Sequence, residues 1–176
     1  MKKILAIIGS TRANSSNLNL IKKLETLTKD IFDITYYKGL TQLPHFNPDI
    51  DTEQPPKKVK EFREIILNAD GILICTPEYV FSLPGSLKNA IEWCVSTTVF
   101  SKKPVGLITA STSGEKAHEE LQLVMKTVET KFTDDTTLLI KSIKAKFNAE
   151  GELTDTETFQ QLQKFILAFQ KLVYSA

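Results

Sequence analysis

The sequence contains few of the residues that mark disulfide-rich or metal-binding proteins. Its 176 residues include two cysteines, two histidines and seven glycines. Cys75 lies in an apolar run and Cys94 in a helical pattern, without CxxC spacing, which predicts two buried, reduced thiols. His45 and His118 are far apart and lack the HExxH spacing, so we expect no metal site.

An excess of one charge and long hydrophobic runs are also absent. The chain has 22 Lys and Arg against 21 Asp and Glu, a net charge of +1, which argues against nucleic-acid and anionic-membrane partners. No stretch approaches the roughly 18 apolar residues of a membrane span. The apolar run 4–8 is too short for a signal peptide. We therefore expect a soluble, cytoplasmic protein.

Short apolar runs alternate with helical stripes along the whole chain. Strands are predicted over 2–9, 32–37, 71–77, 104–110 and 136–140, each followed by residues with helical spacing. This alternation is typical of a mostly parallel sheet with helices on both faces. The length fits one domain over residues 1–176, with no linker or repeat.

Three local signals refine this prediction. Pro84 and Gly85 stand at the entry of the helix expected over 84–95, where a missing N–H group is tolerated. Thr154 and Glu157 fit a capping box at the start of the last helix. The loop 39–56 is long for a compact domain, and such loops are usually functional or mobile.

The loops after the first, third and fourth strands carry most of the candidate chemistry. In an open α/β sheet, ligands bind outside the carboxyl ends of the strands. The first loop, GSTRANSSN, offers hydroxyls, a guanidinium, an amide and free N–H groups at a helix start, which suit a phosphate monoester. These groups come from Ser10, Thr11, Arg12, Ser15, Ser16 and Asn17. An ordinary helix cap explains the same residues equally well.

The other two loops suit a planar, partly apolar ring. The third-strand loop supplies Pro77, Glu78, Tyr79 and Val80, and the fourth supplies Ala110, Ser111, Thr112 and Ser113. The alternatives are an exposed turn and an ordinary βα turn. Glu78 could act as a general base or be merely solvated, and Asp49 and Asp51 could bind a metal or lie in an exposed loop. Because no nucleophile or acid–base cluster appears, we expect a cofactor to supply the chemistry.

Two motifs carry a family resemblance that covers nearly the whole chain. The pattern GS-x-R-x-x-S-x-N is met at residues 9–17, and PEYN-x-S-x-PG-x-LKNAIDW at 77–93 except for Val80 and Glu92. The LP-x-F segment at 43–46 and G-x-LTD-x-E at 151–157 also fit. The sequence therefore resembles the NADPH-dependent FMN reductase family of flavin, quinone, azo-dye and chromate reductases.

This resemblance implies a flavodoxin-like three-layer fold with a five-stranded parallel sheet in the order 2-1-3-4-5. It implies that FMN is bound by Ser10, Arg12, Ser15, Ser16, Asn17, Pro77, Glu78, Tyr79, Val80, Ala110, Ser111, Thr112 and Ser113, with no catalytic side chain. NADPH or NADH would pass a hydride to FMN, and a flavin, quinone, azo compound or metal oxyanion would accept two electrons. A homodimer or homotetramer is also implied.

The sequence departs from the family pattern at two places, and two alternatives to a reductase stay open. Val80 replaces the usual Asn, and the loop at 111–117 contains less glycine than is usual. One alternative is a flavodoxin-like electron carrier that does not itself oxidise NAD(P)H, although such carriers are strongly acidic and this chain is not. Another is a non-catalytic domain that has lost its flavin site.

Overall fold

The computed structural model describes all residues, 1–176, as an alternation of strands and helices. The strands are β1 (Lys2–Ile8), β2 (Phe32–Tyr37), β3 (Gly71–Thr76), β4 (Val105–Ala110) and β5 (Thr137–Ile140). The helices are α1 (Ser16–Leu27), α2 (Lys57–Asn68), α3 (Gly85–Glu92), α4 (Glu115–Thr127) and α5 (Thr156–Tyr174). All ten elements lie where the sequence pattern predicts them, within a few residues.

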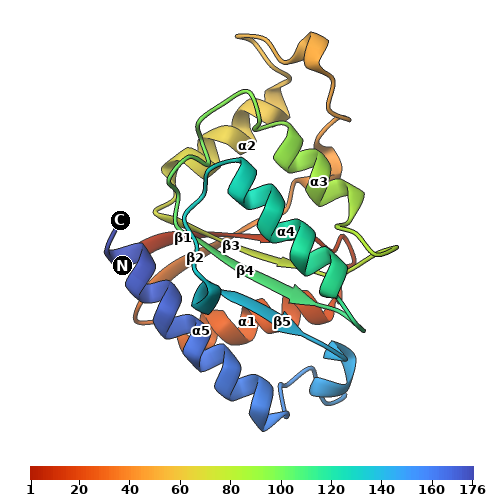
Figure 1. Cartoon of the computed structure of the whole chain (residues 1–176), viewed down its shortest axis with the longest axis vertical. Helices are drawn as coiled ribbons and strands as arrows, with labels where there is room; N and C mark the ends of the chain where they lie inside the picture. Colours follow the sequence, from red (N-terminus) through yellow and green to blue (C-terminus); the bar gives the residue numbers. More distant parts are fainter.

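The five strands form one parallel sheet in the order β2-β1-β3-β4-β5, which confirms the predicted fold (Figure 1). The central register aligns Ile7 with Ile74 and Ile74 with Leu107. All strands therefore end at the same edge of the sheet. At this edge the end of β1 approaches β3 so closely that a Cβ on Gly9 would lie 2.4 Å from Thr76 Oγ1, which explains the glycine.

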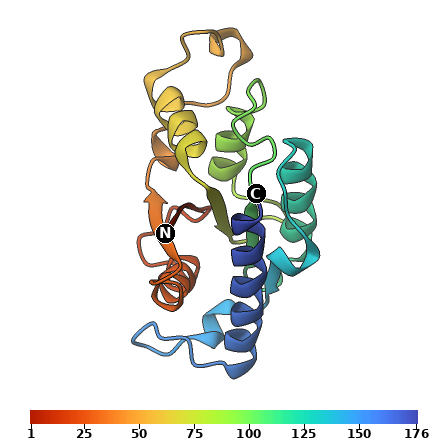
Figure 2. The ribbon, with the colours of Figure 1, turned by 90° about the vertical axis from the view of Figure 1, so that its left-hand side faces the viewer.

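Helices cover both faces of the sheet, and the two sides have separate apolar cores (Figures 1 and 2). On one face α2, α3 and α4 pack around Phe62, Leu87 and Leu121. On the other, α1 and α5 pack around Leu24 and Phe165. Because both faces are covered, the central strands β3 and β4 are buried along their whole length.

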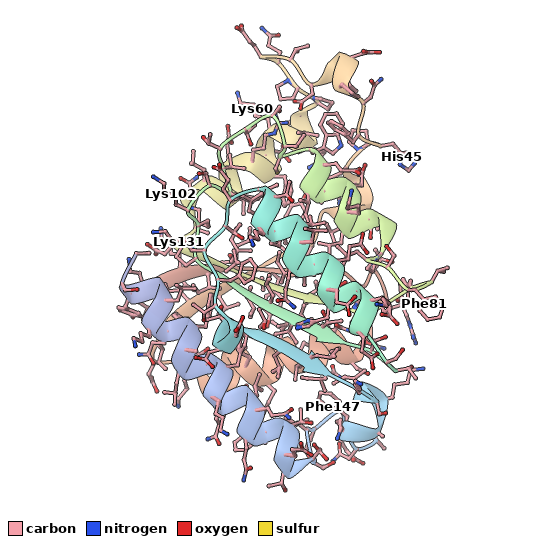
Figure 3. The ribbon with its side chains drawn as sticks, viewed as in Figure 1. His45, Lys60, Phe81, Lys102, Lys131 and Phe147 are labelled. Atoms are coloured by element: carbon pink, nitrogen blue, oxygen red, sulfur yellow. The ribbon has the colours of Figure 1, made fainter.

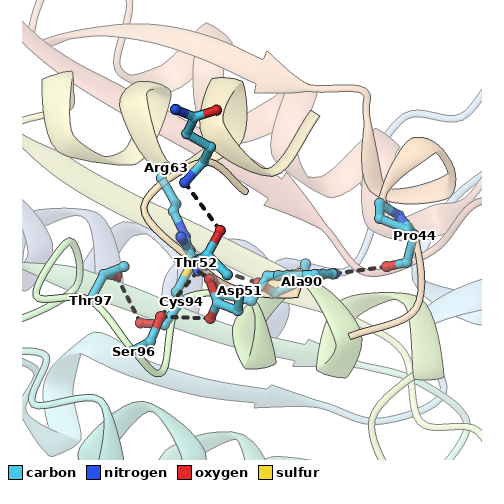
Figure 4. Close-up of polar contacts among 10 residues, drawn as sticks. Pro44, Asp51, Thr52, Arg63, Ala90, Cys94, Ser96 and Thr97 are labelled. Carbon is cyan, nitrogen blue, oxygen red and sulfur yellow. Dashed lines mark hydrogen bonds and ion pairs between the residues drawn. The ribbon is translucent and has the colours of Figure 1, made fainter. Parts of the chain in front are cut away.

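The long segment 39–56 is anchored rather than free. Asp51 lies in an ion pair with Arg63 of α2, at 2.7 Å between Oδ1 and Nη2, and accepts a hydrogen bond from Ser96 (Figure 4). The exposed fractions of the two charged side chains are 5% for Asp51 and 12% for Arg63. In addition, the Asn89 side chain of α3 donates a hydrogen bond to the Pro44 carbonyl and accepts one from the Phe46 N–H. The view of Asp51 as an exposed loop residue is therefore wrong.

The ends of the helices confirm one local prediction and correct another. Pro84 is the N-cap of α3, as expected. The N-cap of α5 is Asp155, whose carboxylate accepts bonds from the Thr158 N–H and hydroxyl, and not Thr154. A charged carboxylate at a helix N-terminus is favoured by the helix dipole, and Thr154 bonds the Lys146 carbonyl instead.

The two thiols lie in the apolar interior. Cys75 and Cys94 are buried and unpaired, as predicted, and burial raises the pKa of both thiols. Four 3-10 turns, at Leu40–Gln42, Pro48–Ile50, Asp134–Thr136 and Ile143–Lys146, lie in segments that the sequence pattern leaves irregular, except that Thr136 was expected to begin β5. No helix combines the length and the apolar character needed to cross a bilayer.

We predict that Asp51→Asn destabilises the fold by about 2–3 kcal/mol at pH 7, because it leaves the buried Arg63 charge without its partner. Burial alone would raise the pKa of Asp51, but hydrogen bonds from Ser96 and Arg63 and the Arg63 charge lower it overall. The stabilisation is therefore present above the ordinary carboxyl pKa and is lost as the pH falls through the lowered value. Urea unfolding of both proteins between pH 7 and pH 3 measures this.

The matched control is Asp49→Asn, a neighbouring exposed aspartate outside any ion pair. It should leave the free energy of unfolding nearly unchanged. The prediction fails if the difference between wild type and Asp51→Asn stays constant as the pH falls to about 3.

Candidate cofactor site

A cleft of about 530 Å³ opens at the edge where all the strands end. It joins the three loops singled out from the sequence, as expected for the carboxyl edge of a parallel sheet. Of the predicted residues, its lining contains Ser10, Arg12, Ser15, Ser16, Asn17, Pro77, Glu78, Tyr79, Ala110, Ser111 and Thr112. Val80 and Ser113 belong to the same loops but do not line the cleft.

The first loop leads into the N-terminus of α1. Some of its polar groups cap the helix, and others are free to bind a ligand. Ser15 is the N-cap of α1, and its Oγ accepts a hydrogen bond of 3.1 Å from the Leu18 N–H. The hydroxyl hydrogen of Ser15 is not used by this bond. The first N–H groups of α1 have no intrahelical acceptor, so they and the helix dipole favour an anion. The same loop can therefore both cap α1 and bind an anion.

Arg12 differs from the other arginine of the chain. Arg63 is committed to Asp51 and the Trp93 carbonyl. Arg12 lies at the cleft, is exposed, and forms no ion pair with any carboxylate of the protein. It also borders a second cavity of about 310 Å³ that extends toward Tyr36, Tyr37 and Lys38 at the end of β2. A guanidinium without an internal partner is available to an external anion.

Asn17 fixes the first loop over the neighbouring strands. Its side chain is buried, donates a hydrogen bond of 3.0 Å to the Ala110 carbonyl at the end of β4, and accepts one of 3.1 Å from the Cys75 thiol of β3. The second hydrogen of its amide is not used by these bonds. Asn17 therefore positions the start of α1 relative to the two strands on which the other loops begin.

Glu78 connects the third-strand loop to the start of α4. Its carboxylate accepts bonds from the Ala117 N–H at 3.0 Å, the Ser113 hydroxyl at 3.1 Å and the Gly114 N–H at 3.3 Å. The bond from Ala117 contributes most to a lowered pKa of Glu78, which burial opposes. Gly114 has φ +98, the left-handed region that glycine tolerates. Glu78 is therefore neither solvated nor poised as a base, because it caps a helix.

The turn that follows Glu78 is strained and exposed. Tyr79 and Ser82 exchange backbone hydrogen bonds of 3.0 and 3.1 Å, and Val80 and Phe81 between them have φ of 52 and 59. Such a two-residue turn favours Asn and Gly, and a β-branched valine there is costly. Phe81 extends away from the body of the protein (Figure 3). The base of the turn is held by Glu120 of α4, which accepts bonds from Ser82 and Leu83.

The geometry also bears on the departure of Val80 from the family pattern. The resemblance places Asn at this position, and Val80 replaces it. In the structure the Val80 side chain is 93% exposed and points out of the cleft, so the preference for Asn follows from the backbone conformation.

One part of the cleft was not predicted from the sequence. The segment after β5 contributes Ile143, Lys144, Phe147, Asn148, Ala149 and Gly151, and the first loop and α1 add Asn14 and Asn19. Phe147 lies beyond the end of β5 (Figure 3). The signal that could have found this segment is its place after the carboxyl end of the fifth strand.

The donors in this cleft fit a phosphate monoester joined to a larger group. They comprise an arginine without an internal partner, the free N–H groups of a helix start and several hydroxyls, next to a cleft of the size that small-molecule ligands occupy. The strand order of the parallel sheet reverses at β1, and the phosphate cradle follows this strand. These two features define a flavodoxin-like protein.

Comparison with known proteins agrees with this class. A family model for NADPH-dependent FMN reductase matches residues 2–145. An NAD(P)H:quinone oxidoreductase of Solanum tuberosum is 31% identical over 97% of this chain and 92% of its own length. An NAD(P)H-dependent FMN reductase of Pseudomonas aeruginosa is 30% identical over 96% of this chain and 93% of its own.

A solved structure supports the same assignment. FerB of Paracoccus denitrificans, a flavoenzyme NAD(P)H:(acceptor) oxidoreductase, superposes with a TM-score of 0.85 at 28% identity, covering 99% of this chain and 98% of that one. The chain belongs to the NADPH-dependent FMN reductase family. It is an oxidoreductase that uses FMN and a reduced nicotinamide coenzyme.

We predict that Val80→Asn stabilises the protein by about 1 kcal/mol, because asparagine tolerates the positive φ that strains valine. The matched control is Val95→Asn, since Val95 is also exposed but has no positive φ. Thermal or urea unfolding of both variants measures the effect. Equal changes in the two variants, or a loss of stability in Val80→Asn, would contradict the assigned strain.

Proposed function

We propose that this chain holds FMN in the 530 Å³ cleft and uses it to carry electrons from NADPH or NADH to a small acceptor such as a quinone or a flavin. The observation that carries the proposal is the exposed, unpaired Arg12 beside the N-terminus of α1, within the same cleft as the loops after β3 and β4. The sequence similarity to quinone and FMN reductases supports it.

The first loop would hold the phosphate. Arg12 would bind it through charge-assisted hydrogen bonds, and the free hydroxyls of Ser10, Ser15 and Ser16 would donate further bonds. Asn17 would offer its second amide hydrogen while keeping the loop in place through Ala110 and Cys75. These groups would act together with the first N–H groups of α1.

The loops after β3 and β4 would hold the isoalloxazine ring. The backbone of Pro77, Glu78, Tyr79 and Val80 would meet its polar edge, and Ala110, Ser111, Thr112 and Ser113 would flank it. Glu78 and Glu120 fasten the first of these loops to α4, so its backbone groups are held in fixed directions. Fixed hydrogen-bond donors cost little reorganisation when a ligand binds.

The chain itself would contribute positioning rather than acid–base chemistry. FMN held in this cleft would supply the two-electron redox chemistry between the nicotinamide coenzyme and the acceptor. Glu78, the one carboxylate in the lining, is occupied by the start of α4 and would take no proton from a substrate. The lining of the cleft thus favours catalysis through the cofactor, without an essential ionisable side chain.

Reduction of the FMN-loaded protein by NADPH and by NADH under anaerobic conditions tests the proposal. An oxidoreductase should bleach the flavin absorbance rapidly and recover it on adding a quinone. A flavodoxin-like electron carrier would hardly react without a separate reductase. A protein that stays colourless after incubation with FMN would rule out both interpretations.

We predict that Arg12→Ala weakens FMN binding about 100-fold without changing the melting temperature of the apoprotein, because the exposed guanidinium supports no internal contact. Titration of flavin fluorescence measures the dissociation constant. Arg12→Lys should recover part of the loss, since it keeps the charge but not the planar fork. Unchanged affinity in Arg12→Ala would show that the phosphate is bound elsewhere.

Three further expectations stay predictions. Residues 1–176 would act as one FMN-binding domain, the protein would assemble as a homodimer or homotetramer, and it would reside in the cytoplasm. The exposed apolar side chains of Tyr79, Val80 and Phe81 beside the cleft are compatible with a subunit contact there. Light scattering coupled to gel filtration determines the assembly state.

A further inference from the structure

The segment that follows β5 carries three lysines, of which two form ion pairs and one does not. Lys141 forms an ion pair with Glu115 at the start of α4. Lys146 forms one with Asp155, the N-cap of α5, at 3.1 Å. Lys144 is exposed, lines the cofactor cleft and pairs with no carboxylate of the protein.

The charges that line the cleft are therefore unbalanced. Its ionised side chains are Arg12, Lys144 and Glu78. The Glu78 oxygens are directed at the N–H groups of Gly114 and Ala117 and the hydroxyl of Ser113, so their charge is compensated by the start of α4. Two cations without internal partners remain, and they match the charge of about −2 on a phosphate monoester at neutral pH.

We infer that Lys144 is a second cationic ligand of the FMN phosphate, acting together with Arg12. The inference rests on the proposed function, because it takes the phosphate to lie in the first-loop cradle. It adds a residue from the segment after the edge strand β5 to a site that the sequence motifs confine to the loops after β1, β3 and β4.

The backbone on which Lys144 stands is well anchored. The N–H groups of Ser142 and Ile143 donate to the carbonyls of Thr112 and Ser111, at 3.0 and 3.1 Å, which joins the segment to the loop after β4. Through these two neighbouring residues, Lys144 is held next to one of the loops proposed to flank the flavin.

The far side of the same segment packs close to α1. Three hydrogen bonds between Asn148 and Glu152 close a tight turn, with Gly151 at φ +81. A Cβ on Gly151 would lie 3.0 Å from Asn19 Nδ2 of α1. The segment thus spans from the β4 loop to α1, the two elements that border the phosphate cradle.

The family match does not account for most of this wall. It ends at residue 145, whereas Phe147, Asn148, Ala149 and Gly151 also line the cleft. Lys144 lies just inside the matched range but outside the two motifs at 9–17 and 77–93, and Gly151 belongs to the G-x-LTD-x-E segment.

The test compares the binding of FMN and riboflavin, which differ only by the phosphate, to the full-length apoprotein. We expect Lys144→Ala to weaken FMN binding about tenfold and to leave riboflavin binding unchanged, as measured by quenching of flavin fluorescence. Lys144→Arg should bind FMN about as tightly as the wild type, because it keeps the charge. Raising the salt concentration should reduce the difference between wild type and Lys144→Ala.

Lys141→Ala is the matched control, because this lysine lies in the same segment but is paired with Glu115. Its FMN affinity should equal that of the wild type. Unchanged FMN affinity in Lys144→Ala, together with a loss in Arg12→Ala, would overturn the role of Lys144 and leave the proposed function intact. An equal loss for FMN and riboflavin would overturn it as well, because the phosphate would then not be the group recognised.

Discussion

The buried side chain of Asn17 is the contact on which the arrangement of the site depends. It joins the start of α1 to the carbonyl at the end of β4 and to a thiol of β3, so three elements are fixed by one amide. A buried amide must satisfy its hydrogen-bonding groups, and here the partners exist in only one position of the helix relative to the sheet. The position of Arg12 and of the cap Ser15 follows from this constraint.

The carboxylates that fix the loops have a task different from that of the cations in the cleft. Glu78, Glu120 and Asp51 each bond groups of the protein itself, and they fix the turn after β3 and the segment 39–56. Arg12 and Lys144 are left without such partners. A site whose acidic groups are satisfied internally and whose cations are not has a positive local potential, even though the whole chain has a net charge of only +1.

The fold could be predicted from the sequence because each strand and helix has a clear period and length. The runs at 71–76 and 105–110 are apolar throughout, and these are the strands that helices cover on both faces. The start of α5 was predicted one residue too early, because Thr154 and Asp155 are both good caps and their bonds to Lys146 and Thr158 appear only in the folded chain. The anchoring of Asp51 was missed for the same reason, since its partners Arg63 and Ser96 are 12 and 45 residues away.

The sequence by itself determined the order of the elements, three of the loops that form the cleft and the family to which the chain belongs, because these depend on local periods and on contiguous motifs. Only the tertiary structure decided how the individual polar side chains are used. It assigned Glu78 to the start of α4, gave Val80 its strained backbone, and brought Lys144 to the cleft of Arg12. The physical reason is that a charged or polar group takes its role from the partner that packing brings to it, and those partners lie far away along the chain.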